Sequence, residues 1–378
     1  MSSRKILSSK TYFKTAEVSC CPLKKLSAEN LADLVDGAAI FSAGGGGDPL
    51  VGHNIVEMLT EKRFPVYLID PLEVPDDGIA INFACVGATA SVAYHGDAAL
   101  KVLVTLEEFL GKKAYAVVPA ELGGFNTLAA VDVAARRGIP IVDADGAGRA
   151  VSEVHLKVYT LDNVPSTPMT VADIDAQNVV LIKQTLDSKV SERIARTRAV
   201  ELNQTVYTAQ NVLTGAQVKT SPVLGTLSHS MRIGMLLRKT VDPLNAVLKE
   251  THGFKLFEGI VSAVERETKA GFTWTTATLN GTHENEGSKF EFKAKNEVLM
   301  GYKDEKLVAI APDIITPVHA ETCKCVPAEK IKKDDKLTVI GIPAHKKWRT
   351  PKGLELWKDV LQRSNISEKY VELEQLNT

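Results

Sequence analysis

Short apolar segments alternate with amphipathic segments along the first 160 residues of the chain. The apolar segments are rich in β-branched residues and end in turn or polar residues, which predicts strands at 65–70, 79–88, 114–121 and 139–146. Apolar residues recur at helical spacing in the segments between them, 49–62, 96–111 and 125–138. This rhythm predicts an α/β fold with a mostly parallel sheet that helices cover on both faces.

The pattern changes twice in the second half of the chain. Two strands are predicted at 169–174 and 178–184, followed by an exposed charged helix at 187–203 and a largely buried helix at 223–239. From 254 to about 343 apolar and polar residues alternate, and Asn280-Gly281 between two such runs is a hairpin signal. We therefore expect an antiparallel, β-barrel-like unit. The predicted domains are 1–240 (α/β), 241–345 (β-barrel-like) and 346–378 (a helical tail).

Net charge, apolar runs and cysteine count exclude some classes of partner for this protein. The chain has 378 residues and a net charge of −1, a balance that argues against a nucleic-acid partner. It has no apolar run of about 20 residues, so no membrane partner is expected. The five cysteines, an odd number without a recognisable signal peptide, favour free thiols and a cytoplasmic location. Residues 1–25 are expected to form a loosely ordered arm, with a targeting segment as the alternative.

Four consecutive glycines, 44–47, directly precede Asp48 and Pro49. Asp48 is a good N-cap and Pro49 suits a first helical turn, so a helix is predicted to begin there. The glycine backbone would then lie against a helix N-terminus, where N–H groups and the helix dipole favour an anion or a polarised carbonyl. A flexible turn is the alternative. The substrate-binding residues predicted in this segment are Gly45, Gly46, Gly47 and Asp48.

Acidic and glycine-bearing loops follow two of the predicted strands, in "PAELGGFN" (119–126) and "DADGAGRAVSE" (143–153). Ligands of open α/β sheets bind beyond the carboxyl ends of the strands, so these loops are expected to form one pocket. Paired carboxylates in a partly dry pocket acquire separated pKa values, which suits them to acid and base roles. The predicted catalytic residues are Asp145, Glu153, Glu121 and Asp143; further predicted substrate-binding residues are His95, Gly124, Asn126 and Arg149.

Several of these residues have competing interpretations. Asp145 can cap the next helix, Glu153 can lie in solvent, and His95 is either a general base or a loop histidine. No cofactor is assigned with certainty; the alternative is a divalent metal ion on Asp145, Glu153 and His155. Half of a metal site at "CKC" (323–325) near His319 is disfavoured, because alternating strand residues point to opposite faces. His229 is interpreted as a core histidine rather than a ligand.

The ordered motifs resemble the S-methyl-thiohydantoin desulfurase family, formerly of unknown function and associated with hydantoinase/oxoprolinase proteins. They are "GGGGDP", "PAELGGFN", "DADGAGRAxxE", "LFEGIVSAVERETKAGF", "NEVL", "APDII" and "VIGIPA", and they span about residues 26 to 350. The resemblance implies a three-layer α/β domain, a β-barrel domain and hydrolysis of a hydantoin-like ring that releases methanethiol. Val151-Ser152 and the tail depart from the family pattern. The pocket set that the resemblance supports is 44–48, Glu121, Gly123, Gly124, Asn126, Asp143, Asp145, Gly148, Arg149 and Glu153.

The leading hypothesis is a hydrolase of a small five-membered nitrogen heterocycle. Asp145 or Glu153 would activate water, Glu121 would protonate the leaving group, and Arg149 with the glycine N–H groups would stabilise developing charge. The alternative is a non-catalytic binding subunit or sensor that partners a hydantoinase/oxoprolinase-type enzyme, with the 187–203 helix as a docking face or simply a solvated surface. A homo-oligomer is also expected.

Overall fold

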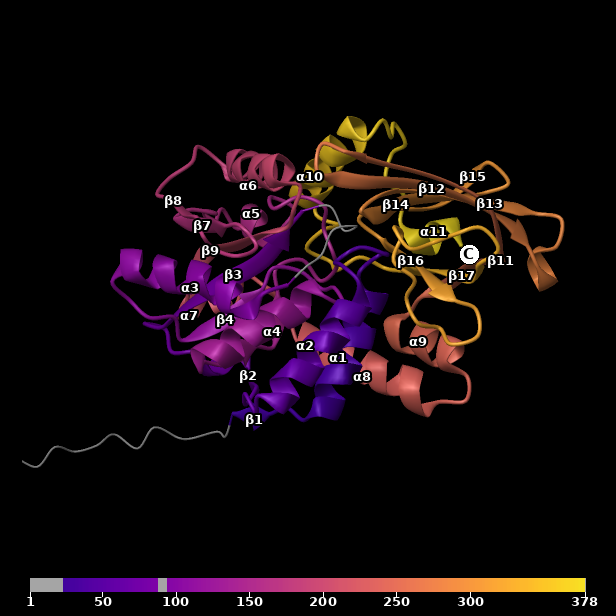
Figure 1. Ribbon diagram of the computed structural model, residues 1–378. Helices are drawn as coiled ribbons and strands as arrows, with labels where there is room; N and C mark the ends of the chain where they lie inside the picture. Colours follow the sequence, from indigo (N-terminus) through magenta and orange to yellow (C-terminus); the bar gives the residue numbers. More distant parts are fainter. Residues whose placement is uncertain (1–22, 88–93, 378) are drawn as a thin grey trace, which may run out of the picture.

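Two large sheets lie side by side in the computed structural model, which describes residues 23–87 and 94–377 (Figure 1). The expected arm at 1–25 therefore falls almost entirely outside the described residues. In spatial order, sheet A consists of β1 (Lys24–Lys25), β2 (Tyr67–Ile69), β5 (Ile141–Val142), β4 (Ala116–Pro119), β3 (Ile79–Val86), β9 (Val206–Thr214), β7 (Met169–Ala172) and β8 (Val179–Ile182).

Sheet A is mixed, which corrects the expectation of a mostly parallel sheet. β2, β5, β4 and β3 run parallel, but β9 pairs antiparallel with β3 and β7 pairs antiparallel with β9. The sequence analysis assigned no strand to β9. Its polar residues Thr208 and Gln210 are fully buried, so the strand lacks the continuous apolar run that marks a central strand.

Helices pack against sheet A on the faces that side-chain alternation defines. Ile81 and Phe83 on β3 share a core with six helices, α1 (Ala28–Ile40), α2 (Pro49–Glu61), α3 (Gly96–Leu110), α4 (Asn126–Arg137), α8 (Thr226–Lys239) and α9 (Pro243–Thr251). Ala80 on the opposite face belongs to a core with α5 (Val158–Leu161) and α10 (Pro351–Arg363). The other helices that the structure describes are α6 (Ser188–Leu202), α7 (Gly215–Val218) and α11 (Leu373–Leu376).

Sheet C is antiparallel throughout and curls into a half-barrel. In spatial order, its strands are β15 (Lys306–Ile310), β14 (Glu297–Lys303), β13 (Lys289–Lys295), β12 (Phe272–Gly281), β11 (Phe254–Lys269), β17 (Lys336–Ile342) and β16 (Ile314–His319). The predicted hairpin exists, because Asn280 on β12 pairs with Lys289 on β13. Its connection is longer than the two-residue turn that the "NG" signal suggested, and it contains a 3₁₀ turn, His283–Asn285.

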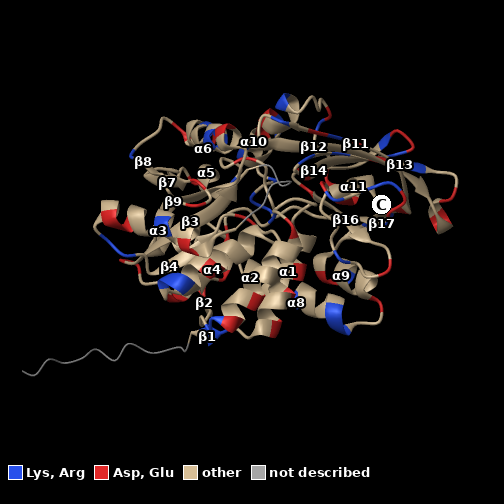
Figure 2. Ribbon diagram, viewed as in Figure 1, with Lys and Arg blue, Asp and Glu red and all other residues tan. Residues whose placement is uncertain are grey.

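The predicted helical tail is part of a core shared by the two sheets. Trp357 on α10 stacks edge-on against Trp348, and both rings lie in one cluster with Val118 of β4 and Leu299 of β14. Figure 1 shows α10 over the region between the sheets. Acidic and basic residues are interspersed over the whole ribbon (Figure 2). In the described part of the chain, no helix combines the length and apolar composition needed to cross a bilayer.

The glycine run joins the two halves of the molecule. Helix α2 begins at Pro49 with Asp48 as its N-cap, as predicted. The carbonyl of Gly44 accepts from the N–H of Ala328 at 2.8 Å, and that of Ala43 accepts from the N–H of Val298 on β14 at 2.8 Å. The carbonyl of Gly46 accepts from the first N–H groups of α4. The main chain of this loop thus hydrogen-bonds both to the sheet C half and to α4.

Glycine is required at these positions because other atoms come too close. A Cβ at Gly45 would lie 2.3 Å from the Glu297 carboxyl, one at Gly46 would lie 2.6 Å from Gly123, and one at Gly47 would lie 2.7 Å from Phe125. Real Cβ atoms essentially never approach so closely. The bare backbone of the glycine run therefore lies against β14 on one side and against the loop before α4 on the other.

Replacing Gly45 with alanine should lower the free energy of unfolding by about 1–3 kcal/mol, because the new methyl group overlaps the Glu297 side chain. Urea denaturation of the variant and the parent protein measures the difference. In a double-mutant cycle, adding Glu297→Ala removes the overlapping atoms, so the Gly45→Ala penalty should shrink. Equal penalties in both backgrounds would contradict this account of Gly45.

Candidate active site

A cavity of about 60 Å³ lies where the carboxyl ends of β3 and β4 meet the glycine loop, α6 and the turn between β13 and β14. A site for one water needs roughly 10–15 Å³ on this measure, so the cavity suits a compact ligand. Its lining comes from both halves of the molecule. The lining residues that bear on chemistry are Gly46, Gly47, Cys85, Glu121, Asn126, Ser152, Glu153, Lys157, Arg196, Gln210, Asn296 and Glu297.

Glu121 lies two residues after the end of β4 and is buried. Its Oε1 accepts from Asn126 Nδ2 at 2.6 Å, and its Oε2 accepts from the main-chain N–H of Val151 at 2.7 Å. Burial raises the pKa of Glu121 to about 7, although these hydrogen bonds act to lower it. Glu121 can therefore exchange a proton near neutral pH.

Glu297 begins β14 on the other side of the cavity and is also buried. Among the described residues, its Oε2 has no hydrogen-bond partner. Burial and, second to it, the neighbouring Glu121 carboxylate raise its pKa to about 8. Two acids that repel each other's negative charge titrate as a pair, so loss of the first proton from the Glu121–Glu297 pair hinders loss of the second.

Lys157 adds a cation that can lose its charge. Its ammonium is buried and donates to Asn82 Oδ1 at 3.1 Å and to Asn211 Oδ1 at 2.6 Å. Burial lowers its pKa to about 7, against the attraction of Glu121. Both of its partners are neutral amides, so the lysine has no ion pair among these contacts to hold its proton. Three titratable groups of the cavity thus change charge within a narrow range around neutrality.

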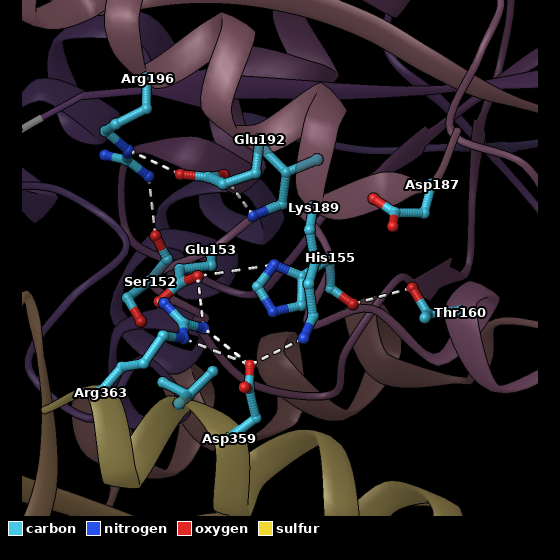
Figure 3. A network of polar contacts seen from close by, with 12 residues as sticks. Ser152, Glu153, His155, Thr160, Asp187, Lys189, Glu192, Arg196, Asp359 and Arg363 are labelled. Carbon is cyan, nitrogen blue, oxygen red and sulfur yellow. Dashed lines mark hydrogen bonds and ion pairs between the residues drawn. The ribbon is translucent and has the colours of Figure 1, made fainter. Parts of the chain in front are cut away.

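Arg196 reaches the cavity from α6 and corrects the expectation that this helix is simply exposed. It donates to Glu192 Oε1 at 2.8 Å and to the carbonyl of Ser152 at 2.7 Å (Figure 3). It also donates to the carbonyl of Gly271 in the β11–β12 turn at 2.9 Å. One face of α6 therefore ties the cavity wall to sheet C.

Glu153 lines the cavity, but its carboxylate forms a clamp between elements. It pairs with the buried Lys295 of β13. It also accepts from both terminal nitrogens of Arg363 on α10 at 3.0 Å, and Figure 3 shows Glu153 and Arg363 facing each other. Burial opposes ionisation, yet the charge of Lys295 and the bonds from Arg363 hold the pKa of Glu153 below its usual value. A carboxylate held ionised by two cations is a poor base, so its geometry indicates a structural role.

Other residues from the predicted set lie outside this cavity. Asp145 is buried, its Oδ2 accepts from the N–H groups of Ala147 and Gly148 at 2.8 Å, and burial raises its pKa to about 7. Asp143 accepts from the N–H of Ser228 at 2.9 Å in the first turn of α8. Asp145 orders the 143–148 loop and Asp143 ties the loop to α8, and neither is among the residues that line the cavity.

Arg149, Asp48, Gly124 and His95 are also placed elsewhere. Arg149 is buried, donates to main-chain carbonyls including that of Asp313 and lies over the Trp357 ring. Besides capping α2, Asp48 pairs with Lys330, and Gly124 packs closely on Pro49. His95 pairs with Asp175 at 2.9 Å in a separate surface groove.

Three buried polar atoms that line the cavity have no hydrogen-bond partner among the described residues: Ser152 Oγ, Gln210 Oε1 and Glu297 Oε2. Buried polar groups are almost always paired with protein or water, so each such atom needs an explanation. Their gathering around one cavity indicates a site that binds a polar molecule.

Two family models match the chain in succession, the S-Me-THD-like N-terminal domain over residues 29–184 and the S-Me-THD-like C-terminal domain over 186–358. The chain belongs to the S-Me-THD-like family. This membership confirms the resemblance found from the motifs. A crystal structure of a protein from Chromobacterium violaceum has the same fold, with a TM-score of 0.78 and 23% sequence identity; the match covers 93% of this chain and 100% of that one. The comparison with curated proteins found no match.

In this S-Me-THD-like chain, no group of three His, Cys, Asp or Glu side chains in the described residues is arranged to hold a metal ion. The "CKC" segment is not a regular strand, because Cys323 has a positive φ of 55° and Cys325 forms only an isolated bridge to Val318. The alternation argued for it from sequence therefore does not apply. Cys85, Cys323 and Cys325 are free thiols, as expected.

Four of the cavity residues that were not predicted from the sequence are the ones that bear most on its charge and reactivity: Cys85, Lys157, Arg196 and Glu297. Glu297 lies inside the "NEVL" motif that carried the resemblance, yet no role was assigned to it. Lys157 sits between apolar neighbours in "HLKVYTL", and a charge in such a run is a usable signal of a functional position. Cys85 and Arg196 gave no comparable signal.

Replacing Glu153 with glutamine should cost about 3 kcal/mol of folding free energy, because it leaves the buried Lys295 without its charge partner. Urea denaturation measures the loss. The matched control is Glu201→Gln, which breaks the more exposed pair with Arg198 and should cost under about 1 kcal/mol. Equal costs in the two variants would rule out the proposed clamp.

The raised pKa of Glu297 predicts a pH-dependent stability difference. The pKa of Glu297 is higher in the folded protein, about 8, than its ordinary value of 4.5. The protonated carboxyl therefore contributes its full stabilisation below pH 4.5, and this contribution is lost as the pH rises through about 8. The amide of Glu297→Gln does not titrate, so this variant does not lose stability for this reason. Its unfolding midpoint should therefore rise relative to that of the parent protein as the pH increases from 5 to 9. A difference in midpoint that stays constant over this range would contradict a buried, proton-binding Glu297.

Proposed function

We propose that this protein is a hydrolase of small five-membered nitrogen heterocycles of the S-methyl-thiohydantoin class. Water replaces the methylthio group of the ring, and methanethiol is released. The Glu121–Glu297 pair is the observation that carries the proposal, because it places one proton acceptor and one proton donor in a single cavity near neutral pH. Family membership supports the substrate class.

The two carboxyl groups take different roles because their surroundings differ. Glu121 accepts two hydrogen bonds that stabilise its ionised form, so it acts as the base. Glu297 has an unpartnered Oε2, and burial and the Glu121 carboxylate raise its pKa, so it keeps its proton and acts as the acid toward the leaving sulfur. This assignment replaces the earlier expectation of Asp145 or Glu153 as base and Glu121 as acid.

The unpartnered polar atoms around the cavity suit a planar ring with amide edges. Gln210 Oε1 can accept from a ring N–H, and Ser152 Oγ can donate to a ring carbonyl. Lys157 in its charged form would stabilise negative charge that develops on a ring nitrogen or oxygen during attack. The small volume of the cavity favours rings without bulky substituents at the buried edge.

The test is a methanethiol assay on S-methyl thiohydantoins and plain hydantoins, with and without a chelator. Glu121→Gln and Glu297→Gln should each lower kcat/KM by about 100-fold or more, the usual contribution of general acid–base catalysis. Glu107→Gln is a matched control, since Glu107 is a buried carboxylate on α3 outside the cavity. Loss of turnover in Asp145→Asn but not in the pair variants would overturn the assignment.

The pH profile gives an independent check. Because the reactive state holds one proton on the pair, kcat/KM should be greatest between about pH 7 and 8 and fall on both sides. Glu297→Gln should lose the alkaline limb, since its amide has no proton to give up. If no ring is turned over but one binds saturably, the protein is instead a binding subunit or sensor, and a hydantoinase/oxoprolinase-type partner becomes the next target.

A further inference from the structure

Cys85, a partly buried free cysteine near the end of β3, is among the residues that line the same cavity as Glu121. The side chain of Asn126 hydrogen-bonds to both Cys85 and Glu121. The N–H of Cys85 donates to Asn126 Oδ1 at 2.8 Å, and Asn126 Nδ2 donates to the Cys85 carbonyl at 3.1 Å and to Glu121 Oε1 at 2.6 Å. One side chain at the start of α4 thus fixes the main chain of the cysteine relative to a carboxyl group.

The thiol needs a base before it can react. Burial and the nearby Glu121 carboxylate both raise the pKa of Cys85 well above its usual range, so the resting group is a protonated thiol. The same proximity makes Glu121 the group that can take the proton when the sulfur attacks. Lys157 and the unpartnered oxygen of Gln210 line the same space and would hold the ring.

We propose that Cys85 is the nucleophile of the hydrolysis and that the reaction passes through a ring bound covalently to its sulfur. The inference rests on the proposed function and deepens it. Water is then the second nucleophile, not the first. The reaction exchanges one sulfur for another at the ring carbon, and a free cysteine is among the residues that line the cavity with the two carboxyl groups.

The first step forms the bond between Cys85 Sγ and the ring carbon that bears the methylthio group, while Glu121 accepts the thiol proton. The bond to the methylthio sulfur breaks, and Glu297 supplies the proton that makes methanethiol. In the second step water adds to the same carbon and gives its proton to Glu297. The bond to Cys85 then breaks, and Glu121 returns the thiol proton. The products are a hydantoin and methanethiol, with no oxidation or reduction.

The test compares the full-length parent protein with Cys85→Ala, Cys85→Ser and the control Cys325→Ala, which alters a thiol that is not among the residues lining the cavity. Rapid-quench assays with an S-methyl thiohydantoin should show a burst of about one methanethiol per chain. Peptide mapping of the quenched protein should show the ring on Cys85. Both Cys85 variants should lose turnover by about 1,000-fold or more, with unfolding midpoints near that of the parent protein.

Undiminished turnover in a folded Cys85→Ala variant would overturn the covalent route and leave the hydrolase proposal standing. If the parent protein turns over no ring, the hydrolase proposal fails and the thiol is tested alone with iodoacetamide at pH 7. Faster labelling of Cys85 than of Cys325, slowed by Glu121→Gln, would support a thiol activated by Glu121. Labelling of Cys85 no faster than that of Cys325 would overturn the activated nucleophile as well.

Discussion

The close approach of a bare glycine backbone to the first residue of β14 is the constraint on which the rest of this structure depends. Because Gly45 has no side chain, the Glu297 carboxyl can lie against the loop, and because Gly46 has none, Gly123 can do the same from the other side. The loop carbonyls are meanwhile paired with Val298 and Ala328. This contact sets the position of sheet C relative to sheet A, and the cavity lies where the two meet.

Burial at this junction carries an electrostatic cost that other contacts must offset. Glu121, Glu297 and Lys157 are each buried in a way that disfavours their charged form. The clamp of Glu153 with Lys295 and Arg363 lies beside them and joins the same two halves, and Arg149 stacks on Trp357 nearby. Functional sites commonly keep such unfavourable groups because the surrounding structure holds them in place.

Much of the fold could be predicted from the sequence, because apolar periodicity reports directly on which face of an element is buried. The strands and helices of the first 160 residues follow that rule, and Asp48 with Pro49 marks the start of α2. β9 escaped because its buried polar residues hide its period. The expectation that ligands bind beyond the carboxyl ends of the strands correctly selected Glu121 and Asn126 as cavity residues. It also selected Asp143 and Asp145, whose carboxylates instead hydrogen-bond within the loop and to α8. Sequence does not show which way a side chain turns from a loop.

The residues that escaped prediction share a physical reason. Glu297 and Arg196 come from elements far from Glu121 along the chain, and only tertiary packing brings them to the cavity. The two family models divide the chain at residues 184 and 186, so Glu121 lies in the first match and both of the other residues lie in the second. The acid–base pair is therefore split between the matched domains. Neither domain alone contains the arrangement that raises both pKa values, so the site is a property of their junction.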